Sequence, residues 1–200
     1  MVLRGAMVVL LAVLLGACSN AQRQPAPEAS LTPRDKKLLA AAPYQKVLPP
    51  EMYQRSLVDY AGTEKPGTIV VDTERKYLYY VQDGGKAIRY GVTVGEEGLA
   101  FKGEAKVGRK AEWPTWTPTP EIKQRLTGIP NFVGPGPHNP MGARALYLYQ
   151  GNKDTLFRIH GTNQPEYIGQ AISSGCIRML NEDVIDLYTR VPQGTNVVVL

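Results

Sequence analysis

The sequence predicts a mixed but mainly β domain with a few short helices, and three observations support that prediction. A chain of 200 residues leaves room for one ordinary domain plus accessory segments, because domains commonly contain about 100–200 residues. From Thr68 onward, short runs of β-branched and aromatic residues alternate with turn residues, which is typical of strands. The composition, with 43% apolar and 20% charged residues, 20 Gly and 16 Pro, excludes a long coiled coil or a wholly disordered chain and disfavours a helical bundle.

The N-terminus has the pattern of an export signal. Arg4 precedes a short apolar run that cannot span a bilayer of roughly 30 Å. The sequence from Leu15 to Cys18 resembles a bacterial lipobox, so we expect residues 1–17 to be removed as a signal peptide and Cys18 to carry a lipid anchor. Cleavage after Ala21 is the alternative, and it would discard Cys18. Either outcome exports the chain to the periplasm or cell envelope, and the lipidated form has a membrane as its partner.

Residues 18–66 are expected to form a lipid-anchored tether and an N-terminal extension. The stretch 19–32 lacks apolar periodicity and is rich in polar residues and proline, which is typical of a flexible tether. Thr32 and Pro33 then provide an N-cap and a first-turn proline for a short helix over 34–42. We expect the rest of the extension to pack against the domain that follows.

Residues 67–200 are expected to form that domain. Strands are predicted at 68–72, 77–82, 86–94, 145–150, 155–160 and 195–200. The last run, from Val197 to Leu200, is continuously apolar, so we expect it to lie inside the sheet. Its removal should then destabilise the whole domain.

Two helices interrupt the predicted strands. One begins at Thr119, with a proline and an acidic residue in its first turn, and ends near Gly128. The other runs from Asn181 to Arg190 and has apolar residues at helical spacing. This second helix begins only a few residues after Cys176.

The segment between Trp113 and Arg144 contains seven prolines and four glycines, a composition that regular ladders do not tolerate. We expect a long surface excursion, and ordered loops of this kind often cover a binding site. An irregular crossover without a ligand is the alternative. Trp113 and Trp116 could flank a saccharide or a peptide, but core packing is favoured for both.

The net charge of +5 is spread along the chain and does not identify a function. The sequence has no basic stripe of the kind that binds phosphate backbones, so nucleic acid is not expected as a partner. The two histidines lie far apart in the sequence without a close-spaced ligand pair, so no metal site is predicted. The sequence also lacks a Walker-type loop and a Gly-x-Ser-x-Gly elbow, and we expect no cofactor.

Cys176 and His160 are the residues whose pairing would support covalent chemistry. Once Cys18 is acylated or removed, Cys176 is the sole thiol and can form no internal disulfide. Only a few per cent of an unperturbed cysteine is thiolate at neutral pH, so a nucleophile needs an acceptor for its proton, and imidazole has a suitable pKa. His160 ends a predicted strand, whereas His138 lies in the Pro/Gly-rich segment and is the alternative base. A buried, inert Cys176 is the competing interpretation.

Two segments contain the most specific motif of the chain: His160-Gly161-Thr162 and, after a connecting loop, Ser173-Ser174-Gly175-Cys176-Ile177-Arg178. Together they resemble the active-site signature of bacterial L,D-transpeptidases, the YkuD-like family. The resemblance extends over about residues 67–200 and includes the turn from Asn139 to Gly142. It implies a β-sandwich-like L,D-transpeptidase catalytic domain. Ser174 departs from the family pattern, which usually has a second histidine there. The departure puts in doubt any hydrogen bond or pKa tuning that this imidazole supplies in the family.

The resemblance implies a role for each motif residue. Cys176 would be the nucleophile and His160 the proton acceptor, with the carbonyl of Gly161 orienting the imidazole. The amides near Gly175 and Cys176 would bind the tetrahedral oxyanion. Substrate contacts are expected from Arg178, Ser174, Asn139 and Gly142.

The implied substrates are peptidoglycan stem peptides. Members of the family attack the carbonyl of the third stem residue, release the terminal D-alanine and form a thioacyl-enzyme, whose acyl group then passes to an amine. Carbapenem β-lactams are expected to inhibit them covalently. Two alternatives stay open: an L,D-carboxypeptidase, in which water is the acceptor, and a noncatalytic peptidoglycan-binding lipoprotein. A papain-like or NlpC/P60-like peptidase is disfavoured, because those families place the cysteine before the histidine, whereas His160 comes first here.

Overall fold

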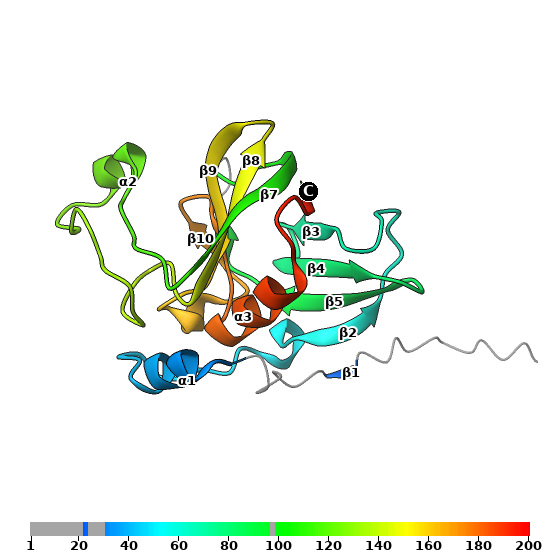
Figure 1. The fold of residues 1–200 in the computed structure, drawn as a ribbon, viewed down its shortest axis with the longest axis horizontal. Helices are drawn as coiled ribbons and strands as arrows, with labels where there is room; N and C mark the ends of the chain where they lie inside the picture. Colours follow the sequence, from blue (N-terminus) through cyan, green and yellow to red (C-terminus); the bar gives the residue numbers. More distant parts are fainter. Residues whose placement is uncertain (1–21, 24–30, 97–98) are drawn as a thin grey trace, which may run out of the picture.

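The computed structural model describes residues 22–23, 31–96 and 99–200 and contains one continuous sheet of ten strands (Figure 1). The strand order is β1-β2-β5-β4-β3-β12-β7-β8-β9-β11, and β6 and β10 form a separate pair. This architecture, with three short α-helices in the described part, confirms the mainly β fold that the sequence predicts. The predicted signal peptide, Cys18 and most of the tether lie outside the described residues.

One half of the sheet comes from the earlier part of the chain. Its strands are β1 (Gln22–Arg23), β2 (Ser56–Asp59), β3 (Ile69–Asp72), β4 (Tyr77–Gln82) and β5 (Lys86–Gly91). All neighbouring pairs among them are antiparallel. The strand predicted over 86–94 ends at Gly91, because the following residues leave β4: Thr93 exchanges backbone hydrogen bonds with Arg178, and β6 (Val94–Gly95) pairs with β10 (Ala171–Ser173).

The other half has longer strands: β7 (Gly103–Glu112), β8 (Arg144–Gln150), β9 (Lys153–His160) and the short β11 (Ile177–Arg178). The sequence analysis missed β7 and the short strands β1, β2, β10 and β11. In β7, Ala105 and Val107 are buried and alternate with charged residues, but Glu, Lys, Ala and Gly have low strand propensity. Pairing with β12 and β8 fixes this segment as a strand.

The strand β12 (Asn196–Val199) joins the two halves, since it runs parallel to β3 and antiparallel to β7. Val197 and Val199 are 0% and 3% exposed, which confirms the prediction that this run lies inside the sheet. In Figure 1, β7–β9 rise steeply across the direction of β3–β5. The halves therefore face each other over a shared core.

The core draws side chains from both halves and from α3 (Asn181–Arg190). It includes Ile69, Leu78, Ile88, Tyr90, Val107, Leu146, Leu148, Ile159, Ile177 and Met179. From α3, the apolar stripe predicted by helical spacing is buried, with Val184 and Leu187 at 0%. Full burial of such a side chain stabilises the fold by about 1.5–3 kcal/mol.

The N-terminal extension packs on the domain through α1 (Pro33–Ala40) and a 3-10 turn (Glu51–Tyr53). Thr32 caps α1 as predicted, and its side chain exchanges hydrogen bonds with Asp35. The helix ends at Ala40 rather than at residue 42, where Pro43 stops a further turn. Leu39 joins a second cluster with Trp113, Ala143 and Ile185.

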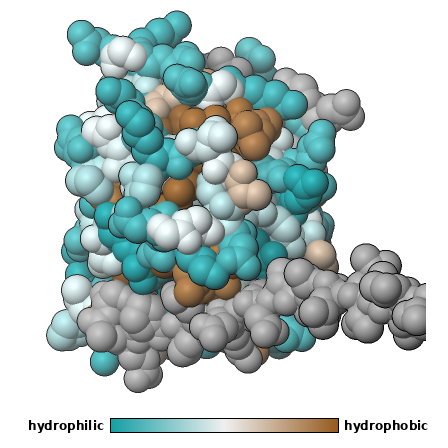
Figure 2. All heavy atoms as spheres, turned by 90° about the vertical axis from the view of Figure 1, so that its right-hand side faces the viewer, coloured by the Kyte–Doolittle hydropathy of each residue, from teal (hydrophilic) through white to brown (hydrophobic). Residues whose placement is uncertain are grey.

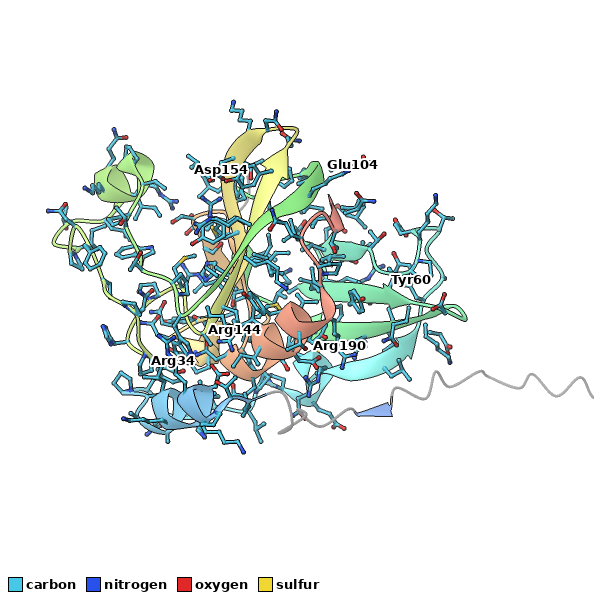
Figure 3. All side chains as sticks on the ribbon, viewed as in Figure 1. Arg34, Tyr60, Glu104, Arg144, Asp154 and Arg190 are labelled. Carbon is cyan, nitrogen blue, oxygen red and sulfur yellow. The ribbon has the colours of Figure 1, made fainter. Side chains whose placement is uncertain are left out.

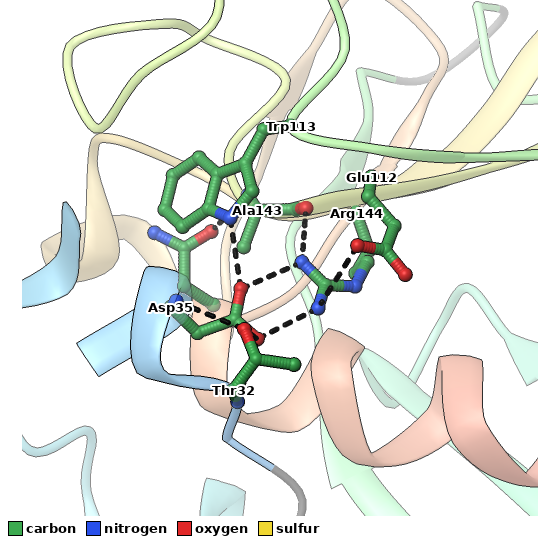
Figure 4. A network of polar contacts seen from close by, with 7 residues as sticks. Thr32, Asp35, Glu112, Trp113, Ala143 and Arg144 are labelled. Atoms are coloured by element: carbon green, nitrogen blue, oxygen red, sulfur yellow. Dashed lines mark hydrogen bonds and ion pairs between the residues drawn. The ribbon is translucent and has the colours of Figure 1, made fainter. Parts of the chain in front are cut away.

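A buried ion pair fixes α1 to β8, and we call it the Asp35 clamp (Figure 4). Arg144 Nη1 and Nη2 donate to the two carboxylate oxygens of Asp35 at 2.9 and 2.8 Å, and Trp113 Nε1 donates to Asp35 Oδ1 at 2.8 Å. Asp35 and Arg144 are 1% and 3% exposed. Burial alone would raise the pKa of Asp35, but the bonds from Arg144, Thr32 and Trp113 hold it at about 2.

The excursion between β7 and β8 contains little regular structure, as predicted. It includes α2 (Pro120–Arg125), which ends before Gly128, and a bridge between Trp116 and Val133. Trp113 is 1% exposed, which confirms the favoured core role, and Trp116 packs half-buried against another cluster. On the face shown in Figure 2, hydrophobic residues form separate patches among hydrophilic ones. Within the described ranges, none of the helices has the length and apolar character needed to cross a bilayer.

Candidate active site

Two adjacent parallel strands bring the segments of His160 and Cys176 together. Ile159 of β9 lies opposite Ile177 of β11, and His160 lies opposite Arg178. Both isoleucines are buried in the core, at 0% and 2% exposed. Because successive side chains of a strand alternate, His160 and Arg178 face the other side. Cys176 directly precedes β11, and its sulfur accepts from the backbone amide of Arg158, two residues before His160.

His160 is held from one side by the peptide that follows it. Its Nδ1 lies 2.6 Å from the carbonyl oxygen of Gly161, and since a carbonyl only accepts, Nδ1 carries the proton and Nε2 keeps its lone pair. Burial lowers the pKa of His160 to about 3, the nearby Arg178 acts in the same direction, and the carbonyls of Gly161 and Met141 oppose them. The imidazole is therefore neutral at physiological pH.

Cys176 is partly buried as a free thiol. Burial raises the pKa of the thiol above its usual value, while the backbone amide and guanidinium of Arg158 and the guanidinium of Arg178 act against that increase. Among the described residues, the imidazole of His160 has backbone partners at the carbonyls of Gly161 and Met141, and no hydrogen bond joins it to the sulfur of Cys176. Catalytic hydrogen bonds often form only when substrate binds.

Arg158 is oriented by its own contacts. Its guanidinium pairs bidentately with Asp154 at 2.7 and 2.9 Å and stacks over Tyr147, 4.4 Å from the ring centre. Figure 3 shows Asp154 toward the β8–β9 turn and Arg144 at the other end of that hairpin, above α1. Arg109 stacks over the same Tyr147 ring at 3.5 Å. Two guanidinium groups therefore stack on the Tyr147 ring, and that of Arg158 is the one that acts on Cys176.

The turn before Cys176 is held by Ser173, whose side chain the sequence analysis did not assign a role. Ser173 is 0% exposed; its hydroxyl accepts from the amide of Gly175 at 3.1 Å and donates to the carbonyl of Cys176 at 2.6 Å. Gly175 has φ +118, and a Cβ there would lie 2.5 Å from the Phe157 ring and 2.6 Å from the Leu99 carbonyl. A side chain at position 175 would push this turn away from its neighbours.

The structure also places the residues expected to contact substrate. Ser174 is exposed, and Arg178 is partly buried with Nη1 donating to Gln164 Oε1 at 3.2 Å. Asn139 is 0% exposed, and its amide bonds to the excursion itself, at the carbonyls of Pro114, Val133 and Gly134 and the amide of Met141. Gly142 has φ +61 and lies against Gly161 and Thr162. Substrate binding by these residues stays a prediction, and Asn139 has a visible role in holding the loop.

His138, the alternative base, is exposed on the excursion, and its ring lies against Gly136 of the same loop. Asn163 Nδ2 donates to its backbone carbonyl at 2.9 Å. Across the described part of the chain, no cluster of three or more His, Cys, Asp or Glu side chains is arranged to hold a metal ion.

Asn181 is the main site residue that the sequence analysis did not identify. It was expected only to begin α3, yet its amide is buried between the excursion and the loop after His160. The signal in the sequence was its position directly after Met179 and Leu180, close to the cysteine motif. Its partners come from distant segments, so spacing alone could not show the contact.

Comparison with known proteins gives a consistent family. The sequence model of the YkuD family, described as the L,D-transpeptidase catalytic domain, matches residues 66–199. The chain is similar to the probable L,D-transpeptidase ErfK/SrfK of Escherichia coli, with 38% identity over 144 residues, 69% of this chain and 45% of that protein. The chain thus spans less than half the length of this relative.

Two solved structures are also similar. A crystal structure from Brucella melitensis, described as a probable carnitine operon oxidoreductase, is 50% identical over 76% of this chain and 96% of that one, with a TM-score of 0.51. The NMR structure of the catalytic domain of Enterococcus faecium L,D-transpeptidase is 26% identical over 70% of this chain and all of that one, with a TM-score of 0.50. The sequence of the present chain contains no Gly-x-Gly-x-x-Gly dinucleotide motif that would accompany an NAD-dependent oxidoreductase.

Proposed function

Because the chain belongs to the YkuD family of L,D-transpeptidases, we propose that it is an acyltransferase for peptidoglycan stem peptides with Cys176 as nucleophile. The observation that supports this proposal is the pairing of β9 with β11, which brings Cys176 beside the end of β9 that carries His160, while the Gly161 carbonyl holds the imidazole. No metal or organic cofactor is needed for this chemistry.

In the first step, the sulfur of Cys176 attacks the carbonyl carbon of the third stem residue. His160 Nε2 accepts the thiol proton as the C–S bond forms. Amides near Cys176 stabilise the oxyanion, and each such donor contributes about 3–4 kcal/mol. The amide of Gly175 donates to Ser173 Oγ in the free enzyme, so it joins them only when that bond opens. Collapse breaks the C–N bond, and the imidazolium returns the proton to the amine of the departing D-alanine. A thioacyl-enzyme remains.

The free enzyme begins this step as a neutral pair. Burial lowers the pKa of His160 to about 3 and raises the pKa of Cys176, so a standing thiolate–imidazolium pair is not favoured. Proton transfer then accompanies attack. We expect alkylation of Cys176 by iodoacetamide to rise with pH up to the alkaline range, whereas a rate that is already maximal at pH 6 would contradict this mechanism.

In the second step, an amine of another stem peptide or of an envelope lipoprotein attacks the thioester, and the thiol is regenerated. Water in the same position would give an L,D-carboxypeptidase. Incubation with purified muropeptides separates these outcomes by mass, because cross-linking joins two peptides whereas hydrolysis yields the tripeptide and free D-alanine.

Intact-mass measurement after incubation with a carbapenem tests the nucleophile. The Enterococcus faecium domain has been solved acylated by ertapenem, which makes this compound a suitable reagent. We expect one adduct on the wild type and none on Cys176→Ser, a near-complete loss with His160→Ala, and substantial adduct with His138→Ala. Absence of an adduct on the folded wild type at near-stoichiometric reagent would instead favour a noncatalytic peptidoglycan-binding lipoprotein with an inert cysteine, an alternative favoured by the raised thiol pKa.

We also propose that residues 1–17 are an export signal and that Cys18 anchors the protein to a membrane of the cell envelope, with residues 18–66 as tether and extension before the catalytic domain at 67–200. The support is the lipobox-like sequence ending in Cys18. Metabolic labelling with palmitate should mark the wild type and not Cys18→Ser. Equal labelling of both would overturn the lipidation proposal.

A further inference from the structure

The side chain of Asn181 forms a buried three-way junction behind His160. The residue is 3% exposed. Its Oδ1 accepts from the amide of Ala143 at 2.8 Å, and its Nδ2 donates to the carbonyl of Thr162 at 2.8 Å and to the hydroxyl of Tyr44 at 2.6 Å. Both amide hydrogens and one oxygen lone pair are therefore used. Asn181 is the first residue of α3, and its Oδ1 accepts from Ala143 rather than from an amide of the helix.

The amide of Asn181 occupies space that two glycines leave open. A Cβ on either Gly142 or Gly161 would lie 2.2 Å from Asn181 Oδ1. A Cβ on Gly142 would also lie 2.5 Å from the nitrogen of Thr162 and 2.6 Å from the carbonyl carbon of Gly161. Those two atoms belong to the peptide whose oxygen contacts His160 Nδ1. Asn181 and Gly142 thus enclose the peptide that sets the imidazole.

Tyr44 brings the N-terminal extension into the same junction. It lies outside the segment 66–199 that matches the family, and the Asp35 clamp attaches its neighbouring helix to the domain. Burial raises the pKa of Tyr44, so its hydroxyl is neutral and can accept from Asn181. Tyr44 of the extension is therefore hydrogen-bonded to the Asn181 amide, which lies behind His160.

We propose that Asn181 is a positioning residue for His160 and that Tyr44 completes its position, so that the N-terminal extension is part of the catalytic unit. This proposal rests on the proposed function for its kinetic consequence. Loss of the junction frees the Gly161 carbonyl to turn away from Nδ1. The imidazole then exchanges between two tautomers, and in one of them Nε2 carries the proton and cannot accept that of the thiol.

The variants are Asn181→Ala, which removes the junction, and Tyr44→Phe, which removes one hydroxyl. Tyr60→Phe is the matched control, because Tyr60 is also in the extension and its hydroxyl donates to Glu64 rather than to the domain. We expect the rate of ertapenem acylation to fall by about tenfold to a hundredfold in Asn181→Ala, in line with the effect of small misplacements, and two- to fivefold in Tyr44→Phe. Tyr60→Phe should match the wild type.

A second readout reports position independently of catalysis. The sequence has two histidines, so imidazole ¹⁵N spectra of His160 and His138 are readily separated with a His138→Gln reference. We expect the Nδ1–H tautomer for His160 in the wild type and in Tyr60→Phe, and a mixture in Asn181→Ala and, to a smaller degree, Tyr44→Phe. A general loss of stability would not select a tautomer.

The outcomes separate the two proposals. If ertapenem does not acylate the wild type but Asn181→Ala changes the tautomer of His160, the proposed function is wrong and the positioning role of Asn181 holds. Acylation and tautomer that stay unchanged in both variants would overturn the positioning proposal while the function stands. Should Asn181→Ala not fold, Tyr44→Phe decides the matter, since it leaves the junction occupied by a ring of the same shape.

Discussion

The Asp35 clamp and the His160–Cys176 site are both buried polar groups next to β8, yet burial has opposite consequences in them. Arg144 faces the clamp, and its neighbour Ala145 lies opposite His160 in the sheet. In the clamp, two charges are paired bidentately and the pKa of Asp35 is lowered to about 2. In the site, Arg158 and Arg178 offset the burial of the Cys176 thiol only in part and disfavour a charged His160, so both catalytic groups are kept neutral. The ion pair of Asp35 with Arg144 attaches α1 to β8, whereas the neutral His160 and Cys176 can exchange a proton during a reaction.

The largest expected effect separates chemistry from stability at the site. His160→Gln keeps a donor for the Gly161 carbonyl but removes the base, so carbapenem acylation should fall by about 10²–10⁴-fold. The midpoint of urea unfolding at pH 7 should change little. If His160→Gln instead lost much stability and kept its acylation rate, His160 would be a structural residue and not the base.

The clamp should respond in the opposite sense. Asp35→Asn leaves the buried Arg144 with only the longer contact to the partly exposed Glu112, at 3.8 Å, and breaking a buried pair costs about 3–5 kcal/mol of unfolding free energy. Urea unfolding measures this loss, and protein that remains folded should still be acylated. Asp59→Asn is the control, because the ion pair of Asp59 with Lys86 is exposed and such pairs contribute about 0–1 kcal/mol.

The pH dependence of stability distinguishes the regions further. The pKa of His160 is about 3 in the folded protein, below its unfolded value, so its contribution is complete above pH 6.5 and is lost as pH falls toward 3. Asp35, with a folded pKa of about 2, loses its contribution only below about pH 4. Between pH 6.5 and 4.5 the wild type should therefore lose about 2–3 kcal/mol relative to His160→Gln.

Denaturant unfolding at several pH values measures that difference. Asp183, whose pKa burial raises to about 7, acts in the opposite direction, since its contribution decreases as pH rises through 7. It is present in both proteins and cancels in the comparison. Parallel pH profiles for the wild type and His160→Gln would show that the imidazole is not buried in its neutral form.

The smallest effect tests how the clamp is completed. Trp113→Phe keeps an aromatic ring in the core but removes the donor to Asp35 Oδ1. Loss of one such hydrogen bond should cost about 1.5–3 kcal/mol, because the acceptor is charged. Calorimetry should show a lower Tm with an unchanged acylation rate. An unchanged Tm would mean that Arg144 and Thr32 satisfy the carboxylate without Trp113.

The sequence predicted the elements whose signals are local. Strands β3, β4, β8, β9 and β12 follow runs of β-branched and aromatic residues, and α3 follows helical spacing. The strand β7 was missed because its charged residues favour a strand only between β12 and β8. The same limit applies at the site: the motif around Cys176 is contiguous, whereas the contact of Asn181 with Tyr44 joins residues separated by 137 positions.

The position of β12 has a consequence for how the molecule reaches this state. The strand that links the two halves of the sheet comes after both of them in sequence and pairs with β3 near the start of the domain. During synthesis, each half can gather its own hairpins, but the interior cannot close until β12 has emerged. Such high contact order slows folding, so the newly made chain stays open and susceptible to proteolysis for longer than a fold built from neighbouring segments.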